Sequence, residues 1–389
     1  MSPTFWSRIM GKQRYKETVY KSQASFEEQK TLEYGLEVDR PYRSALYVEN
    51  YTKGTAANAQ DLTATSDKLT VNKSKTILMY VDTIDKLQNK WDAVTQWGTD
   101  AGKKCDINID AEYLYEVVNA NLDVDDGDVG GTDGSPLTLS TSNISTVVSK
   151  INRKLDEQNV PRQGRFWNIS PQMFEVLWAY IAGKESLLGD KTGEGGGVGK
   201  YGGLELYMTN NLTASAVWTP VDNPTDEATI TIDGVVFTFQ SVIGAVAGNV
   251  LQTTNLETTL TNLAHLINNP ASTTANHVAF SGADLRTVQE MVAVATATYI
   301  TVYHKGKSYM TVATSEALDL WSKATQHSLA GAKGAIDMVI QRQPKTDIAS
   351  TVSAGKAGTN VMILDVFGVQ TFNQGKNEIV NVKIATAAF

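Results

Sequence analysis

The acidic stretch Asn121 to Pro136 carries carboxylates at a density that suggests a calcium-binding loop. Such a loop needs acidic ligands at its first, third and fifth positions, glycine at the sixth and glutamate at the twelfth. Counted from Asp123, the fifth position is Gly127 and the sixth is Asp128, and no other register fits the pattern. The spacing favours a solvated acidic turn over a metal site.

Glycines in the middle of the chain match the sequence pattern of a nucleotide-binding loop but not its structural context. Gly197, Gly199 and Gly202 satisfy G-x-G-x-x-G, but the strand-like LELYM follows them where an anion site needs a helix N-terminus. Lys200 is followed by Tyr201 and not by Ser or Thr, which excludes a P-loop. A flexible glycine-rich loop is the favoured interpretation.

The histidines and the single cysteine show no spacing typical of catalysis or metal binding. No two histidines stand four residues apart, and there is no G-x-S-x-G elbow. The lone Cys105 excludes an internal disulfide and a cysteine-rich zinc site. We therefore expect no enzyme activity, no cofactor and no bound metal. The histidines are read as ordinary core or surface residues: His265, His277, His304 and His327.

Composition indicates a folded chain of more than one domain. The 389 residues exceed the ~100–200 of a usual domain, and 42% are hydrophobic against 20% charged. The longest apolar run, Met291 to Tyr303, is well short of the ~20 residues of a membrane helix. Residues near Met1 lack the apolar region of a secretory signal, so we expect the protein to act in a cytoplasm.

Charge is unevenly distributed along the chain. The formal net charge is -8, yet residues 1–21 carry five Lys or Arg against Glu17 alone. This basic segment is either a solvated terminus or an arm that touches a polyanion or a partner. Between Thr213 and Leu318, eight acidic residues face three basic ones in a sequence rich in Thr, Ala and Val. The change in texture predicts a separate inserted domain.

The region before the insertion reads as an arm followed by a long helix. Pro41 to Tyr80 contains two strand-like stretches, 44–51 and 69–81, around a small polar tip, which predicts a hairpin arm whose tip, Tyr51 to Asp67, adds little to the subunit core. Apolar residues recur on one helical face from Ile84 to Cys105. They predict a helix from Thr83 to about Asn121, broken only if CDINID interrupts it.

The remaining elements alternate between helices and short strands. A helix is expected from Thr141 or Ser142, then a buried strand at 165–169, and then a helix capped by Ser170 with Pro171 at its first position. Inside the insertion, a hairpin turns at Asp233-Gly234 and a helix ends at Asn269-Pro270. A helix through 327–344 and two closing strands, 360–372 and 378–387, complete the prediction.

This order of elements resembles the tailed-phage major capsid proteins of the Hong Kong 97 fold. The stretches that carry the resemblance are VPRQGRFWNISP, TNNL and AGAKGAIDMVIQRQP, and the resemblance covers most of the chain outside the insertion. It implies an α+β fold with an extended hairpin arm, a long spine helix, a peripheral sheet and an axial domain, plus a small α+β insertion domain. The implied segments are 1–40 (N-terminal arm), 41–80 (hairpin arm), 81–141 (spine helix and peripheral segment), 142–212 and 319–345 (axial domain), 213–318 (insertion) and 346–389 (closing peripheral strands).

The resemblance implies a structural function and a set of partners. The chain would assemble, as pentamers and hexamers of itself, into the icosahedral shell of a tailed double-stranded DNA bacteriophage, inside the host bacterial cytoplasm. Because only ~40 residues precede the arm, a separate scaffolding protein is implied. Further implied partners are a portal protein, packaged DNA through weak non-specific contact and a decoration protein, with no membrane contact. A tail or baseplate component is the alternative.

Two groups of residues are predicted to make the contacts of such an assembly. One group lies on the hairpin arm and is expected to touch neighbouring subunits. It consists of Tyr42, Arg43, Tyr47, Tyr51, Lys53, Asp61, Thr63 and Lys73. The other group is the basic N-terminal segment, expected to face the shell interior. It consists of Arg8, Lys12, Arg14, Lys16 and Lys21.

Overall fold

The computed structural model describes residues 15–43, 46, 48–54, 64–83, 93–184, 199–316, 320–322, 324–353 and 356–386. The chain forms two compact units. Unit 1 comprises residues 1–13, 24–105 and 334–375, and unit 2 comprises residues 14–23, 106–333 and 376–389. In the described part, no helix is long and apolar enough to cross a membrane.

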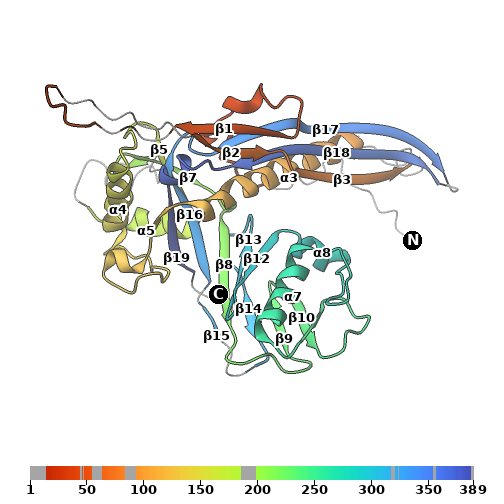
Figure 1. Ribbon diagram of the computed structural model, residues 1–389. Coiled ribbons are helices and arrows are strands. Elements are labelled where there is room, and N and C mark those ends of the chain that lie inside the picture. The colour runs from red at the N-terminus through yellow and green to blue at the C-terminus, as the bar shows by residue number, and fades with distance from the viewer. Residues whose placement is uncertain are drawn as a thin grey trace. The chain divides into compact units, whose positions relative to one another are not determined.

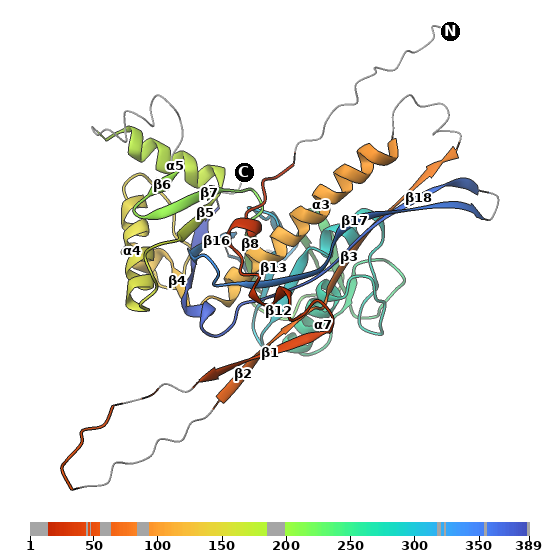
Figure 2. The same cartoon turned by 90° about the horizontal axis from the view of Figure 1, so that it is seen from above.

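Unit 1 is built on a three-stranded antiparallel sheet in the order β17-β18-β3 (Figure 1). A two-stranded ribbon, β1 with β2, precedes it in the sequence (Figure 2). The ribbon packs through Leu69 and Val71 against Val339 and Phe372, which forms a small core within the unit. The elements are η1 Glu27–Gln29, β1 Glu37–Arg43, β2 Ala64–Thr70, β3 Lys73–Asp82, β17 Asp337–Ser353 and β18 Lys356–Gln370.

Strand β17 pairs with β18 along its length but not in one continuous register. The register shifts once between Ile340 and Arg342 and again between Arg342 and Lys345, and each shift places one extra residue on β17. Pro344 lies in the second irregular step, where a residue without a backbone N–H costs no ladder hydrogen bond. Such bulges bend a strand and increase its twist.

The predicted arm strands were displaced by several residues. Strand β1 lies at 37–43, before the predicted first arm strand at 44–51, of which only 46 and 48–51 are described and these form no strand. In the β1-β2 register Val38 pairs with Leu69. The second predicted strand is interrupted after Thr70, so that β2 and β3 are separate. Buried Leu69 and Val71 hold this region against the small core of unit 1.

The long helix is confirmed where the structure describes it. Helix α3 runs from Ala93 to Tyr115 without a break at CDINID and continues as η2, Glu116–Asn119. Within unit 1, Ala101 and Cys105 of this helix pack on Ile363, with Ile77 and Met79 alongside. Residues 84–92, the predicted first part of the helix, lie outside the described residues.

Unit 2 contains a ten-stranded mixed sheet whose main path is β12-β13-β8-β16-β5-β7-β6, with β15, β19 and β4 joined at its sides. Strand β16 sits in its middle and pairs with β5, β8 and β19. The strands are β4 Leu122–Val124, β5 Arg165–Ile169, β6 Lys200–Tyr201, β7 Leu204–Met208, β8 Thr213–Thr219, β12 Met291–Ala295, β13 Ile300–His304, β15 Leu320–Trp321, β16 Thr325–Ala332 and β19 Ile379–Ala385.

The helix predicted over 327–344 was wrong, because this stretch forms β16 and the start of β17. Strand β16 is buried on both faces, so its apolar residues do not alternate with polar ones and the period of two is hidden. The small residues of β16 allow neighbouring strands to approach its backbone closely. A Cβ at Gly331 would stand 2.5 Å from the carbonyl oxygen of Glu378 on the chain leading into β19.

Helix α5 begins at the predicted cap, whereas α4, predicted from Thr141 or Ser142, begins at Ile144 after Asn143. The Ser170 hydroxyl accepts from the Met173 backbone N–H at 3.4 Å, and Pro171 is the first helical residue of α5. The buried face of α4 is formed by Ile144, Val147, Val148, Ile151 and Leu155. The helices are α1 Tyr20–Gln23, η3 Asp126–Val129, α4 Ile144–Glu157, α5 Pro171–Ala182, α7 Leu256–Asn268 and α8 Gly282–Val288, with η4 Gly375–Asn377 before β19.

The region predicted as an insertion has its own hydrophobic core within unit 2. All buried members of this core come from 214–310, and its largest fully buried side chains are Trp218, Phe237 and Phe239. This region contains a four-stranded sheet, β11-β10-β9-β14 (Figure 1), while its β8, β12 and β13 continue the ten-stranded sheet. Helix α7 packs against both β11 and β12. The hairpin at Asp233-Gly234 and the helix end at Asn269 are confirmed. Its further strands are β9 Thr229–Ile232, β10 Val235–Gln240, β11 Asn249–Leu251 and β14 Val312–Thr314.

Candidate functional site

The acidic turn is held together by its own backbone. Asp125 accepts from the backbone N–H of Gly127 at 3.0 Å and of Gly134 at 2.7 Å, so both carboxylate oxygens are occupied. Lys154 pairs with Asp128 at 2.6 Å. Among the described residues, no group of three His, Cys, Asp or Glu side chains could hold a metal ion. The turn is therefore explained by local structure.

The glycine pattern ends in a tight hairpin. Gly202 has φ +58° and joins β6 to β7, and a Cβ there would stand 2.5 Å from Val148 Cγ1. A strand follows, as predicted, and not a helix N-terminus. Gly197 lies outside the described residues.

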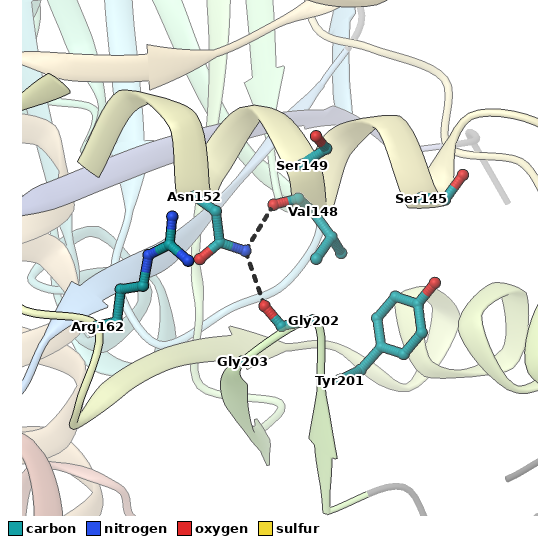
Figure 3. A pocket seen from close by; sticks show the side chains of 8 residues that line it. All are labelled: Ser145, Val148, Ser149, Asn152, Arg162, Tyr201, Gly202 and Gly203. Atoms are coloured by element: carbon teal, nitrogen blue, oxygen red, sulfur yellow. Dashed lines mark hydrogen bonds between the residues drawn. The ribbon is translucent and has the colours of Figure 1, made fainter. Parts of the chain in front are cut away.

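A hollow of about 400 Å³ lies between this hairpin and α4 (Figure 3). Asn152 spans it, donating to the carbonyl oxygens of Val148 at 3.1 Å and of Gly202 at 2.9 Å. Its one cationic lining residue, Arg162, is paired with Asp156 at 2.7 Å outside the hollow. The lining groups are hydroxyls, an amide and a paired guanidinium, which do not form an acid and base couple.

The structure brings Ser215, His327 and Asn381 into an arrangement that the sequence did not reveal. The Ser215 hydroxyl lies 2.8 Å from Nε2 of His327, and Nδ1 of the same ring lies 3.0 Å from Oδ1 of Asn381. Because an amide oxygen only accepts, Nδ1 carries the proton and Nε2 accepts from Ser215. All three side chains are buried between strands, with Ser215 only 5% exposed. A nucleophile needs access to its substrate, so this network serves the sheet and not catalysis.

We expect this network to make stability fall with acid. Burial lowers the pKa of His327 to about 4, whereas the unfolded imidazole titrates near its usual 6.5. As the pH falls from 6.5 to 4, the unfolded chain binds a proton on this imidazole while the folded chain does not. The free energy of unfolding therefore falls by up to about 3 kcal/mol by pH 4. Urea unfolding at pH 7 and pH 4.5 measures the loss. His327→Gln should lose distinctly less stability over the same range, and equal losses in both proteins would refute the assignment.

His304 is engaged with a carboxylate of the insertion hairpin. Its Nδ1 lies 2.5 Å from Oδ2 of Asp233, and Lys307 lies 2.6 Å from the other oxygen. Burial opposes ionisation of Asp233, but the hydrogen bonds from His304 and Lys307 outweigh it and lower the pKa of Asp233 to about 2. This ion cluster ties the β9-β10 turn to β13.

The arm residues predicted to make contacts divide into two kinds. The Tyr42 hydroxyl donates to Asp67 at 2.8 Å and accepts from the backbone N–H of Asn373 at 2.9 Å. Burial and then the Asp67 hydrogen bond raise the pKa of Tyr42 to about 12. Tyr42 thus belongs to the subunit's own structure. Asp67 does too, so the prediction that the whole tip to Asp67 adds little to the subunit was wrong at this end.

The arm beyond Tyr42 presents apolar side chains to solvent. Val48 is fully exposed, and Leu46 and Tyr51 are each 74% exposed. Lys53 is also exposed, and Lys73 is half-buried at the start of β3. The predicted contact residues Tyr47, Asp61 and Thr63 lie outside the described residues, as does the side chain of Arg43.

One face of the unit 1 sheet carries exposed apolar residues that the sequence analysis did not single out. Along β3, Ile77 and Met79 contribute to small cores on one face, while Leu78 and Tyr80 on the opposite face are 67% and 42% exposed. Leu78 pairs directly with Met362 of β18, which is 37% exposed. We call Leu78, Tyr80 and Met362 the apolar stripe. Contiguous exposed apolar surface is typical of protein interaction sites.

The described part of the basic N-terminal segment is fastened to unit 2. Lys21 pairs with Asp106 at 2.9 Å, and Lys16 donates to the carbonyl oxygen of Gly306. The backbone N–H groups of Val19 and Tyr20 both donate to Oδ1 of Asp110, at 2.8 and 2.9 Å. Arg8, Lys12 and Arg14 lie outside the described residues.

The chain matches no protein-family model and no curated protein sequence. Solved structures are similar to it over nearly their whole length. A structure from Mycobacterium phage Che8 has a TM-score of 0.58 at 14% identity, covering 97% of this chain and 96% of that one. The capsid of cyanophage P-SCSP1u gives 0.52 at 10% identity, covering 99% and 93%.

The mature capsid of bacteriophage PhiM1 gives a TM-score of 0.52 at 10% identity, covering 100% of this chain and 93% of that one. The chain therefore has the α+β fold of these structures, and the expected fold class is confirmed.

Proposed function

We propose that this chain is the major capsid protein of a tailed double-stranded DNA bacteriophage and that many copies assemble into its icosahedral shell. The observation that carries the proposal is mutual coverage. The similarity to the P-SCSP1u and PhiM1 capsids spans almost all of both chains, insertion and arm included, and not a single shared module. A shell needs contacts that repeat between copies of one chain and close into rings, and the arm and the apolar stripe offer surfaces for such contacts.

The surfaces described above support this proposal over an enzymatic one. The candidate constellations found in the described residues are either buried in a sheet, as with Ser215 and His327, or satisfied by local hydrogen bonds, as with Asp125. By contrast, large apolar side chains are exposed on the arm and on the unit 1 sheet. We propose that the arm residues 46–54 and the apolar stripe contact neighbouring copies in the shell.

The finer partners belong to the same proposal. A separate scaffolding protein would guide assembly, a portal protein would occupy one vertex, and packaged DNA would meet the interior through weak non-specific contact. We propose that the basic segment containing Arg8, Lys12 and Arg14 faces that interior, because its local charge is opposite to that of the chain as a whole. The acidic insertion would face outward, where a decoration protein could bind. Assembly would take place in the host bacterial cytoplasm.

Electron microscopy of the purified full-length chain tests the proposal. We expect rings of five or six copies, or closed shells, when the chain is concentrated alone or with the scaffolding protein of its own genome. Tubes would instead indicate a tail component. A chain that stays monomeric at every concentration and with the scaffolding protein present would contradict the proposal.

A charge placed on the apolar stripe is expected to block assembly without unfolding the subunit. Leu78 is 67% exposed, so Leu78→Glu should change the free energy of unfolding by less than about 0.5 kcal/mol. At a buried contact between copies, the same carboxylate would be desolvated without a partner in every copy. Ser74→Glu, on the same exposed face of β3 but outside the stripe, is the matched control. The yield of particles is measured by sedimentation. A normal yield for Leu78→Glu would show that the apolar stripe is not part of the interface between copies.

A further inference from the structure

Two histidines of the inserted region that are twelve positions apart in the sequence lie side by side in the fold. His265 is on the exposed side of α7, and His277 follows in the return segment to β12. Their ring centroids are 4.9 Å apart and their planes are inclined by 46°. The pair could not be predicted, since the spacing of the two histidines matches no helical or turn motif.

Both histidines belong to backbone segments that are held in place by hydrogen bonds or packing. The segment around His277 adds to the edge of β11, with Val278 N–H donating to Asn249 at 3.0 Å and Leu251 N–H donating to Asn276 at 2.7 Å. Helix α7 is fixed by its buried face, which includes Leu260, Leu263 and Ile267. A site on such elements holds its geometry before a ligand arrives.

The nitrogens of His277 are used unequally. Nδ1 lies 3.0 Å from the Thr274 hydroxyl. Nε2 is buried and has no hydrogen-bond partner within the described structure, although the ring is 0% exposed. An unpaired buried nitrogen is costly, and it requires an explanation. The partner held by one imidazole nitrogen determines which nitrogen is left to bind a proton or a metal.

The ring separation fits two imidazoles bound to one metal ion. A metal–nitrogen bond of about 2.0–2.1 Å places the ring centroid about 3.2 Å from the metal, so two ligands at an angle of about 90–110° have centroids about 4.5–5.2 Å apart. The observed 4.9 Å falls in this range.

We propose that His265 and His277 form a binding site for one divalent transition-metal ion, which water reaches only from the side of the exposed His265. Imidazole selects zinc, nickel and copper, whereas magnesium and calcium prefer oxygen ligands. Two protein ligands make an open, exchangeable site and not a structural one of four ligands. The site goes beyond the proposed shell function, because it requires no assembly.

Calorimetric titration of the untagged full-length chain with Zn²⁺ and Ni²⁺ at pH 7.5 tests the site. We expect one ion per chain, no response to Mg²⁺, and at least a tenfold weaker affinity for His265→Gln, since even the loss of an outer partner of a ligand costs 10- to 100-fold. His265 is exposed, so this variant should fold normally. Glu257→Gln, on the first turn of the same helix, is the control and should bind as the parent does.

Electron paramagnetic resonance of the Cu²⁺ form provides an independent measurement. We expect nitrogen couplings from two imidazoles in the parent and from one in His265→Gln. No binding by the parent, or equal affinity and identical spectra for the parent and His265→Gln, would overturn the proposal, whatever the outcome of the assembly experiments.

Discussion

A subunit whose arm is shortened to a tight turn is expected to fold but to lose closed-shell formation almost completely. The change replaces residues 44–63 with Asn-Gly, so that the last pair of the ribbon, Arg43 with Ala64, flanks a two-residue hairpin turn. The described side chains removed include exposed Leu46, Val48 and Tyr51, which contribute little to the subunit's own core. We expect the free energy of unfolding to change by less than about 1 kcal/mol.

Assembly should respond far more strongly, because a small loss of contact free energy is repeated at every contact of a shell.

The position at which the arm is cut matters. A cut extending through Asp67 would remove the acceptor of Tyr42 and of the Asn373 backbone N–H and would confuse folding with assembly. Lys53→Ser within an arm of full length is the control for a single exposed arm residue. Electron microscopy and urea unfolding are read together. Normal shells from the shortened chain would show that the arm is dispensable, and failure to fold would show that it belongs to the core.

Removing the Asp110 carboxylate should cost on the order of 4 kcal/mol of subunit stability. Its Oδ1 accepts from the backbone of Val19 and of Tyr20, and its Oδ2 accepts from the Asn211 amide at 3.0 Å. Burial raises the pKa of Asp110 against the effect of these three hydrogen bonds. Asp110→Ala leaves two buried backbone donors unpaired, and each costs about 1–3 kcal/mol.

Asp110→Asn separates the hydrogen bonds from the charge. Its amide oxygen can still accept from Val19 and Tyr20, while its NH₂ group meets the donating amide of Asn211, so we expect about half the loss. Urea unfolding followed by tryptophan fluorescence measures both variants. Protease cleavage near Lys21 should accelerate in Asp110→Ala, because the N-terminal segment is then released. A loss below about 1 kcal/mol for Asp110→Ala would mean that other contacts hold this segment.

The elements that could be predicted from the sequence are those with strong local signals. Ser170-Pro171 begins α5, Asp233-Gly234 turns the β9-β10 hairpin, and Asn269 ends α7, each through chemistry confined to a few residues. Strand β16 could not be predicted in this way, because it is buried on both faces and shows no alternation of apolar and polar residues, and its pairing strands lie far away in the sequence. The start of β1 was missed because its register depends on Leu69, more than twenty residues later.

The candidate sites followed the same division. The acidic turn is a local structure, since the Asp125 carboxylate accepts from backbone groups of the same turn. Ser215, His327 and Asn381 meet only through strand pairing of β8, β16 and β19, and His265 meets His277 only when the return segment joins β11. Exposure is equally hidden in a sequence. Leu78 and Met79 are similar in type, and the pleat of β3 alone decides which one faces solvent.

The interrupted register of β17 gives the unit 1 sheet a built-in joint. Regular pairing with β18 covers Asp337 to Ile340 on one side and Lys345 to Ser353 on the other, and Pro344 lies between them. If the sheet bends at the joint, the hydrogen bonds of both regularly paired stretches stay in place. Only the few residues between them, which have no regular partner, then change conformation. A shell of identical chains has both flatter and more sharply curved places. In the shell proposed above, this joint would let one sequence fit both kinds of place without breaking its sheet.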